Sequence, residues 1–494
     1  MLTGFRVQNF KAFEDTMFIE LKPLTLLSGI NSAGKSSILQ ALLLLKQTLE
    51  SGGAHLTPVG PLLEQTLGGN FTDFVFMRPD PSDAALTYRL MFTYEPEEKL
   101  LFKHLSAFIF EKPQDMVQPL TVMVEITFIQ GQFGSRSREA VRVKILETVG
   151  LLPRRDLIGL RVRHQAVSDS YSVEFIKDKT DKMLQDLAVE QLEVSLAKDF
   201  LPQFLGVDRW AQQDALRDIP QSFVEFWREL FRLVQFDLSD NISYLSSFRE
   251  SPLRAYAKAA IKESSYHGAD FAFVLWARGR DKVSFVNQEG KLIKSDLRGA
   301  VRQVLVDILG LDQYKGVQEI DVGQIAVRFA PLGFASKSQE DKDLLLSEVG
   351  LGYNQILPVI VHGLLTPPGG LVIFEQPEIH LHPDVQAKLV QFFVGLAKAG
   401  RRVLVETHSS HMIEHLCLEI AQDDTNWLAQ NAQTLFIHAP DATHKSARIE
   451  TIEITPYGEI LNWPPYFLPD VAALDEEIIR AGFARQQKER ETSA

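Results

Sequence analysis

Eight consecutive residues near the N-terminus carry the clearest chemistry in this sequence. The segment Gly29-Ile-Asn-Ser-Ala-Gly-Lys-Ser36 fits the pattern G-x-x-x-x-G-K-[ST] of a phosphate-binding loop. Glycines let the backbone approach a phosphate without a Cβ in the way, and the N–H groups of such a loop point at the anion. We expect Lys35 to meet the β- and γ-phosphates of ATP and Ser36 to bind Mg²⁺.

The loop stands in the structural context that this motif needs. Residues 24–27 form a short apolar run typical of a strand, and a helical pattern begins at Lys35. Residues 39–45 are apolar on nearly every face, which predicts a buried helix. The predicted nucleotide-binding residues are Gly29, Asn31, Ser32, Ala33, Gly34, Lys35, Ser36 and Ser37.

A second apolar strand, residues 371–374, leads into Glu375. We expect this carboxylate, with Ser36, in the Mg²⁺ shell. Gln376 follows it directly, and a glutamine can orient an attacking water but cannot take its proton.

A third apolar run, residues 403–405, is followed by Glu-Thr-His-Ser, in which His408 is placed to hydrogen-bond the γ-phosphate or the attacking water. Ser347 and Gly350 lie where a further helix is predicted to begin, and such a terminus binds anions or is simply capped. The predicted catalytic residues are Glu375, Gln376, Glu378 and His408.

In this order the motifs resemble the ABC ATPase superfamily. The likeness is greatest to its SMC-like branch, the bacterial AAA-type ATPases related to the overcoming-lysogenization-defect proteins. It rests on N-F-K-A-F at residues 9–13, on F-E-Q-P-E-I-H-L-H-P at 374–383 and on E-T-H-S at 406–409. Residues 244–256 and 458–464 are similar to a subgroup with a C-terminal domain of unknown function.

The resemblance implies an α/β fold: an ABC/SMC-type P-loop ATPase head formed from both chain ends, with a β-rich lobe and a mainly helical insertion. The implied divisions are 1–94 for the N-terminal part of the head, 95–176 for its β-rich segment, 177–317 for the insertion, 318–440 for the C-terminal part of the head and 441–494 for a C-terminal extension.

The resemblance also implies a head-to-head dimer that sandwiches two ATP molecules. Ser347 and Gly350 of one subunit would then close on the γ-phosphate held by the other. Lys11 resembles the basic residue on the phosphate side, and His380 and His382 fall near the partner subunit. Asp73 resembles, more weakly, a residue that senses the metal ion.

The sequence departs from the family pattern at one position. In ABC ATPases a catalytic glutamate usually follows the metal-binding acid directly, and here Gln376 stands in its place. The resemblance therefore implies that hydrolysis is slow, or that Glu378 acts as the base.

The length and composition of the chain exclude several classes of protein. A chain of 494 residues is too long for one ordinary core. The net charge of −13 argues against a surface that coats nucleic acid indiscriminately. A single cysteine, Cys417, excludes an internal disulfide framework and favours the reducing cytoplasm. The longest apolar run, near residues 38–45, is too short to span a membrane.

Three hypotheses follow for the function. The first is a slow, dimeric ATPase that switches a DNA-related or anti-phage defence complex, with an effector protein as partner. The second is an ATP-bound scaffold that barely hydrolyses, which Gln376 favours. The third, the motor subunit of a transporter, is disfavoured by the N-F-K-A-F start and the long insertion. Basic clusters that suit DNA, or ordinary solvated faces, are Arg136, Arg138, Arg142, Lys144, Arg154, Arg155, Arg161, Arg163, Arg278, Arg280 and Lys282.

Overall fold

The structure is a computed structural model of the whole chain. It describes residues 1–50, 74–77, 84–95, 119–130, 137–149, 152–165, 170–177, 192–194, 221–249, 251–257, 268, 270–330 and 343–464. Asp73, and with it the predicted metal-sensing segment, lies outside these residues, as does Arg136.

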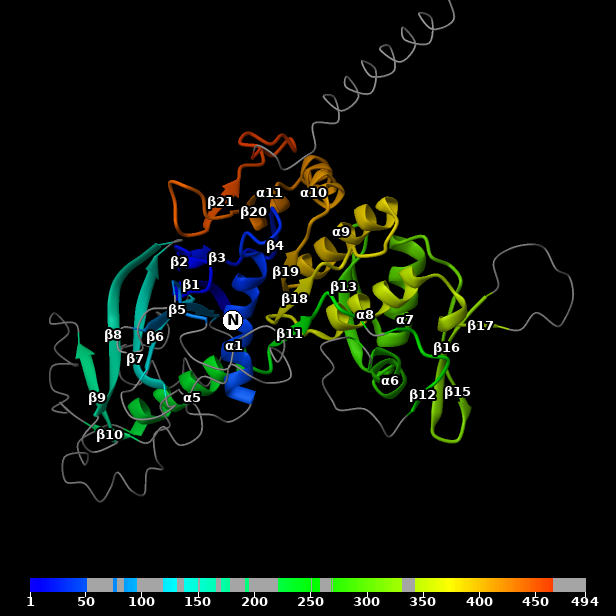
Figure 1. Ribbon diagram of the computed structural model, residues 1–494. Helices are drawn as coiled ribbons and strands as arrows, with labels where there is room; N and C mark the ends of the chain where they lie inside the picture. Colours follow the sequence, from blue (N-terminus) through cyan, green and yellow to red (C-terminus); the bar gives the residue numbers. More distant parts are fainter. Residues whose placement is uncertain are drawn as a thin grey trace, which may run out of the picture.

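A six-stranded sheet forms the centre of the molecule (Figure 1). Its strands, in spatial order, are β11 (Ile242–Leu245), β18 (Leu371–Glu375), β19 (Arg402–Glu406), β4 (Leu24–Gly29), β20 (Ala432–His438) and β21 (Arg448–Ile452). The first five are parallel, and β21 is antiparallel to β20. Because β4 lies between β19 and β20, the prediction that both chain ends build one α/β head is confirmed.

A nine-stranded antiparallel sheet forms the β-rich lobe. It contains β1 (Leu2–Phe10), β2 (Phe13–Asp15), β3 (Ile19–Glu20), β5 (Ala85–Tyr94), β6 (Leu120–Gln130), β7 (Ser137–Val149), β8 (Leu152–Gln165), β9 (Ser170–Lys177) and β10 (Leu192–Val194). Alternate residues of β5 are buried, as period-two patterning predicts for a sheet with one face on the core.

Two helices fill the space between the sheets. α1 (Lys35–Glu50) and α5 (Gln221–Leu238) share one apolar core with the nine-stranded sheet and with one face of the six-stranded sheet. In β18, Leu371 and Ile373 point to this core, whereas Val372 and Phe374 point to a second core. Burial on both faces explains why these strands read as continuous apolar runs.

The second core lies on the opposite face of the six-stranded sheet. It is covered by α8 (Leu351–Leu365), α9 (Pro383–Lys398) and α10 (Ser410–Gln422), which lie beside the sheet in Figure 1. The other elements on this side are α6 (Phe271–Ala277), β13 (Lys282–Val286), β14 (Leu292–Asp296), α7 (Leu297–Gln303), the π-helix η4 (Val304–Ile308), the 3₁₀ helix η5 (Leu346–Glu348), α11 (Trp427–Asn431) and the sheet of β12 (Tyr256–Ala257), β15 (Tyr314–Asp321), β16 (Gln324–Phe329) and β17 (Leu344–Leu345).

One strand lies within the range that the sequence assigns to the insertion and yet belongs to the ATPase sheet. β11 pairs in parallel with β18, which is more than a hundred residues later in the chain. Its four residues carry no local signal of that pairing. The division of the chain into segments therefore stays a prediction.

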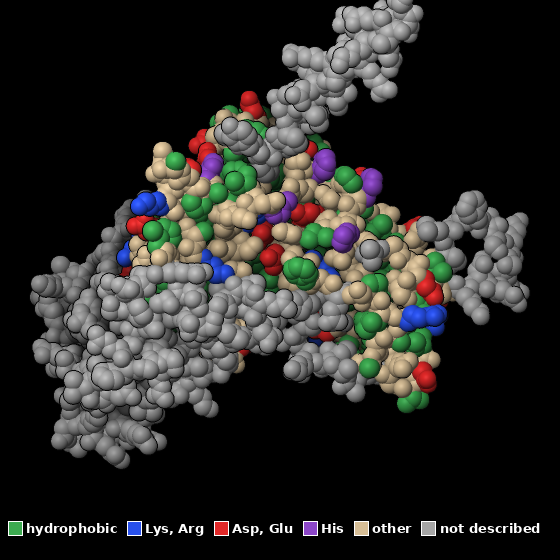
Figure 2. Space-filling model, viewed as in Figure 1, with side chains coloured by type: hydrophobic (Ala, Val, Ile, Leu, Met, Phe, Trp, Pro, Cys, Tyr) green, Lys and Arg blue, Asp and Glu red, His purple; other side chains and the backbone are tan. Residues whose placement is uncertain are grey.

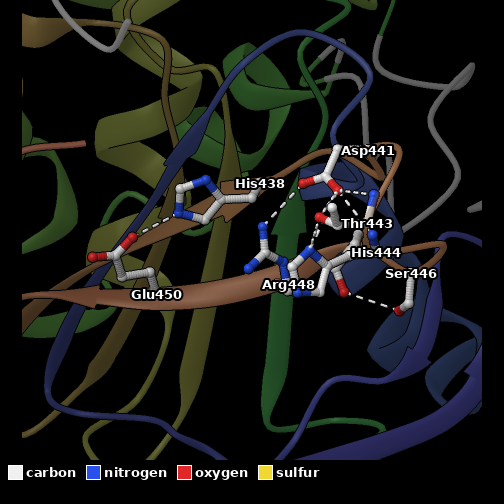
Figure 3. A network of polar contacts seen from close by, with 8 residues as sticks. His438, Asp441, Thr443, His444, Ser446, Arg448 and Glu450 are labelled. Carbon is white, nitrogen blue, oxygen red and sulfur yellow. Dashed lines mark hydrogen bonds and ion pairs between the residues drawn. The ribbon is translucent and has the colours of Figure 1, made fainter. Parts of the chain in front are cut away.

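The loop between β20 and β21 braces the start of the chain. Asp441 accepts hydrogen bonds from the backbone N–H groups of Thr443 and His444, and Arg448 pairs with it at 3.2 Å (Figure 3). The N–H of Ala447 then donates to the carbonyl of Ala12 at 2.8 Å. These contacts hold the β1–β2 turn in place.

No helix in the described ranges is both long enough and apolar enough to cross a bilayer.

Candidate nucleotide-binding site

The phosphate-binding loop follows β4, and α1 begins at Lys35 as predicted. Gly29 has φ of 146°, and a Cβ there would lie 2.4 Å from the carbonyl oxygen of Ile437 on β20. Gly34 has φ of 112°, which residues other than glycine rarely adopt. The backbone path of the loop thus requires both glycines. Asn31 and Ser32 stand exposed at its tip.

Lys35 is buried and folded into the loop. Its Nζ donates to the carbonyl oxygens of Gly29 at 2.9 Å and Ile30 at 2.8 Å. Burial lowers the pKa of Lys35, and the nearby Glu406 carboxylate acts in the opposite direction. An ammonium held only by neutral carbonyls retains its attraction for a phosphate.

Ser36 and two carboxylates form the metal end of the site. The Ser36 hydroxyl donates to Oε1 of Glu406 at 3.1 Å. Glu406 ends β19, and its Cα partner across the parallel pair is Glu375, the last residue of β18. Sequence reasoning proposed Glu375 as the metal-shell acid and assigned no role to Glu406. The sequence does contain a signal for Glu406, since this residue, like Glu375, ends an apolar strand.

Gln376 and Glu378 lie in the turn after β18. Gln376 has φ of 43°, and its N–H donates to the carbonyl oxygen of Glu406 at 2.8 Å. Oε1 of Glu378 accepts from the Thr407 hydroxyl and from the N–H of His408, both at 2.8 Å. Glu378 is buried, and desolvation raises its pKa despite these bonds. The carboxylate of Glu378 therefore ties the turn after β18 to the turn that presents His408.

His408 is close enough to the phosphate-binding loop to sense its charge. Desolvation first, and then the charge of Lys35, lower the pKa of His408. The structure thus brings Lys35, Ser36, Glu375 and His408 to the carboxyl ends of neighbouring strands, where ligands bind in open parallel sheets.

Two residues from β11 and the loop after it complete this edge, and neither was predicted as a site residue. The Tyr244 hydroxyl donates to Oε2 of Glu375 at 2.6 Å. Burial lowers the pKa of Arg249 to about 10, while the carboxylates of Glu378 and Glu375 act to raise it. Arg249 therefore lies within electrostatic reach of both acids. Only the pairing of β11 with β18 brings them there, so local sequence gave no signal.

Comparison with known proteins agrees with this geometry. The family model of the AAA ATPase domain matches residues 1–206 and 281–413, which is more than half of the chain. The chain belongs to this AAA ATPase domain family. No curated protein matches it.

This AAA ATPase chain is also similar to solved SMC head domains. The SmcHead bound to the C-winged helix domain of ScpA has a TM-score of 0.41 and 10% identity, with 92% of this chain and 98% of that chain covered. The SMC head domain from Thermotoga maritima has a TM-score of 0.36 and 11% identity, with 92% and 99% covered. The Smc head domain with an extended coiled coil from Pyrococcus furiosus, bound to the C-terminal domain of ScpA, has a TM-score of 0.38 and 8% identity, with 92% and 96% covered.

The AAA ATPase site contains buried polar atoms that lack hydrogen-bond partners in the described part of the chain. They are Oε2 of Glu406, Oε2 of Glu378, and Nε and Nη2 of Arg249. Buried groups of this kind are costly unless something satisfies them. Carboxylate oxygens suit Mg²⁺ and guanidinium N–H groups suit phosphate. The residues present therefore fit an ATP molecule with its magnesium ion.

Some acidic and histidine side chains lie close together in the middle of the face shown in Figure 2. His380 and His382 are both exposed, in the turn before α9. His382 caps this helix, because its Nδ1 accepts from the N–H of Asp384 at 3.3 Å.

The remaining predicted binding residues lie in two other places. Lys11, in the β1–β2 turn, donates from Nζ to Gln40 on α1 at 2.6 Å, and burial lowers its pKa to about 8. Ser347 lies in η5, and Gly350 caps α8; both are exposed. Within the described residues, no hydrogen bond joins Ser347 or Gly350 to the phosphate-binding loop of the same chain.

Proposed function

We propose that the chain binds ATP with Mg²⁺, dimerises head to head around two nucleotides and hydrolyses ATP slowly. The observation that carries this proposal is the arrangement of Lys35, Ser36 and Glu375. A lysine that donates to two backbone carbonyls stands beside a serine and a strand-ending acid that suit a metal ion. When bound, Mg²⁺ would neutralise charge on the phosphates, and Ser36 and Glu375 would hold it.

The chain's own residues then act on the terminal phosphate. Lys35 binds the β- and γ-phosphates, and Arg249 adds charge from the β11 side. His408 hydrogen-bonds the γ-phosphate or the attacking water. Gln376 orients that water without accepting its proton, which keeps turnover slow. As the setting we propose a DNA-related or anti-phage defence complex in the cytoplasm, with DNA and an effector protein as partners.

The basic clusters give this setting little support. Arg278 pairs with Asp281 at 2.8 Å. Such a pair is typical of an ordinary solvated surface. The side chains of Arg138, Arg142 and Lys144 on β7 lie outside what the structure describes. The choice of DNA as a partner therefore rests on the sequence resemblance.

A dimerisation test uses the exposed Ser347. We expect Ser347→Arg to abolish the ATP-dependent dimer because a bulky cation fills the contact proposed to meet the partner's γ-phosphate. ATP binding by the monomer should be unchanged, since Ser347 makes no bond to its own loop. Light scattering after size exclusion, with and without a non-hydrolysable ATP analogue, measures the first effect, and calorimetry measures the second.

Gln288→Arg is the matched control for this test. Gln288 is exposed on the β13–β14 turn, and its side chain donates to Gln391 on α9 at 2.7 Å. This variant should dimerise like the wild type. An ATP-dependent dimer of Ser347→Arg would contradict the head-to-head arrangement, and a wild type that stays monomeric with bound ATP would do the same.

A pair of substitutions at Glu378 separates its two candidate roles. The amide oxygen in Glu378→Gln would still accept from Thr407 and from the N–H of His408, so this variant should keep near-normal turnover if Glu378 only positions His408. Glu378→Ala should lose turnover by about 10-fold to 100-fold, as a misplaced catalytic group does. Steady-state phosphate release measures both variants.

The opposite result would identify Glu378 as the general base. In that case Glu378→Gln would be as inactive as Glu378→Ala, because an amide cannot take a proton. Loss of turnover in neither variant would exclude both roles. The scaffold hypothesis, which Gln376 favours, predicts ATP-dependent dimers with no measurable turnover in the wild type.

A further inference from the structure

We propose that Glu406 is a second metal-binding carboxylate, which acts with Glu375 and Ser36 to bind a divalent cation before the nucleotide arrives. This inference deepens the proposed function, because it concerns the same site. It goes beyond the single strand-ending acid that the phosphate-loop motif predicts.

Strand register places the two carboxylates side by side. Glu375 and Glu406 are the last residues of β18 and β19 and are Cα partners in a parallel pair. Neighbouring strands lie about 4.8 Å apart, and register partners point to the same face of a sheet. Two like charges at this spacing repel each other unless a cation lies with them.

The oxygen atoms of Glu406 show where such a cation belongs. The side chain is 1% exposed, so water offers it little solvation. Oε1 accepts from Ser36, the residue predicted to bind the metal ion. Oε2 is buried and has no hydrogen-bond donor in the described part of the chain. A buried carboxylate oxygen without a donor is unfavourable, and a bound cation removes that penalty.

Two cationic side chains of the described residues, Lys35 and Arg249, lie near the carboxylates. The ammonium of Lys35 already donates to two backbone carbonyls in the loop. Arg249 acts on Glu378 and Glu375. These two cations face three carboxylates, those of Glu375, Glu378 and Glu406, so negative charge remains in excess at this edge of the sheet.

The three proposed metal ligands, Glu375, Glu406 and Ser36, leave some coordination positions of the cation free. Among the described residues, no group of three or more acidic, histidine or cysteine side chains forms a closed metal cage. Two carboxylates and a hydroxyl leave room for water and, later, for phosphate oxygens. Magnesium is bound in this way at phosphate-transfer sites, through one or two carboxylates, water and substrate.

The test measures Mn²⁺ binding to the full chain without nucleotide, by electron paramagnetic resonance of the free ion, with Mg²⁺ as competitor. We expect Glu406→Gln to weaken Mn²⁺ binding about 10-fold or more, since it removes one of two charged ligands. Glu375→Gln should weaken binding similarly. Glu414→Gln, an exposed acid on α10, should bind Mn²⁺ like the wild type.

Glu406→Asp is the control for the case in which Glu406→Gln fails to fold. It keeps the charge and should retain most of the Mn²⁺ binding. Binding by Glu406→Gln equal to that of the wild type would overturn the proposal, and so would a wild type that takes up no Mn²⁺ until ATP is added. The melting temperature gives a second readout: Mn²⁺ should raise it in the wild type but not in Glu406→Gln.

Lys35→Met separates this proposal from the proposed function. It should lose ATP binding yet bind Mn²⁺ at least as tightly as the wild type, because Lys35 is not a metal ligand and its positive charge opposes a cation at Glu406. A protein that binds ATP but no free cation would refute only the role of Glu406. A protein that binds Mn²⁺ through Glu406 but no ATP would refute only the ATPase.

Discussion

Lys35→Ala is expected to weaken ATP binding by about 100-fold, which corresponds to about 2.7 kcal/mol of binding free energy. The lysine is the cation of the phosphate-binding loop, and its ammonium donates to the neutral carbonyls of Gly29 and Ile30. Charge-assisted bonds to phosphate are among the strongest that a side chain makes. Hydrolysis should fall to background. Calorimetry with ATP and Mg²⁺ measures the first effect, and phosphate release measures the second.

A second lysine on the same helix provides the control. Lys46 is also buried on α1, but it pairs with Glu50 at 2.7 Å, far along the helix from the loop. Lys46→Met should leave ATP affinity within about 2-fold of the wild type, although it removes an ion pair and lowers stability. Equal loss of affinity in both variants would point to damage of α1. Unchanged affinity in Lys35→Ala would exclude the phosphate-binding role.

Glu406→Gln is expected to stabilise the metal-free protein at neutral and alkaline pH. Burial first, and then the charge of Glu375, raise the pKa of Glu406 from 4.5 to about 7 in the folded chain. The hydrogen bond from Ser36, the charge of Lys35 and the nearby polar side chain of Gln376 oppose this rise. An acid with a raised pKa makes the folded state less stable wherever the unfolded chain has already lost the proton.

The direction of the pH effect follows from the pKa of Glu406, which is 4.5 in the unfolded chain and about 7 in the folded chain. Below 4.5 the carboxyl is neutral in both states and has no effect on the free energy of unfolding. As the pH rises from 4.5 to about 7, the unfolded chain ionises first and the wild type loses stability. Above that window the loss is complete, at roughly 3 kcal/mol. Glu406→Gln has no ionisable side chain at this position, so its free energy of unfolding does not fall in this way.

The measurement is the difference in the free energy of unfolding between variant and wild type, which cancels the effect of other titrating groups. Urea denaturation in EDTA, from about pH 4 to about pH 8, should show an advantage for Glu406→Gln that grows with pH. Millimolar Mg²⁺ should shrink that advantage, since the cation offsets the charge. A difference that is flat with pH would mean that Glu406 titrates normally. Glu414→Gln should show no trend.

Much of the site could be predicted from the chain alone because its signals are local. The glycines, lysine and serine of residues 29–36 follow from the geometry of a loop that wraps a phosphate. The start of α1 at Lys35 and the strand that ends at Glu375 follow from hydrophobic patterning. Each of these features depends on residues close together in sequence, where periodicity and residue type determine the backbone.

β11 is an element that local hydrophobic patterning could not predict. Its four residues are too few to distinguish a strand from the end of a helix, and its partner β18 lies far along the chain. Consequently Tyr244 and Arg249 appeared in the sequence only as part of a family-like segment. Their contact with the acids became apparent once the sheet order was known.

The sequence by itself determined that a triphosphate loop, a strand-ending acid and a histidine belong to one α/β ATPase domain. Only the tertiary structure decided that Glu406 stands beside Glu375, that Tyr244 holds Glu375 and that Glu378 ties down the turn of His408. The physical reason is that parallel strands pair across long stretches of chain. Their register, and with it the charge environment of each carboxylate, is fixed by packing on both faces of the sheet rather than by neighbouring residues.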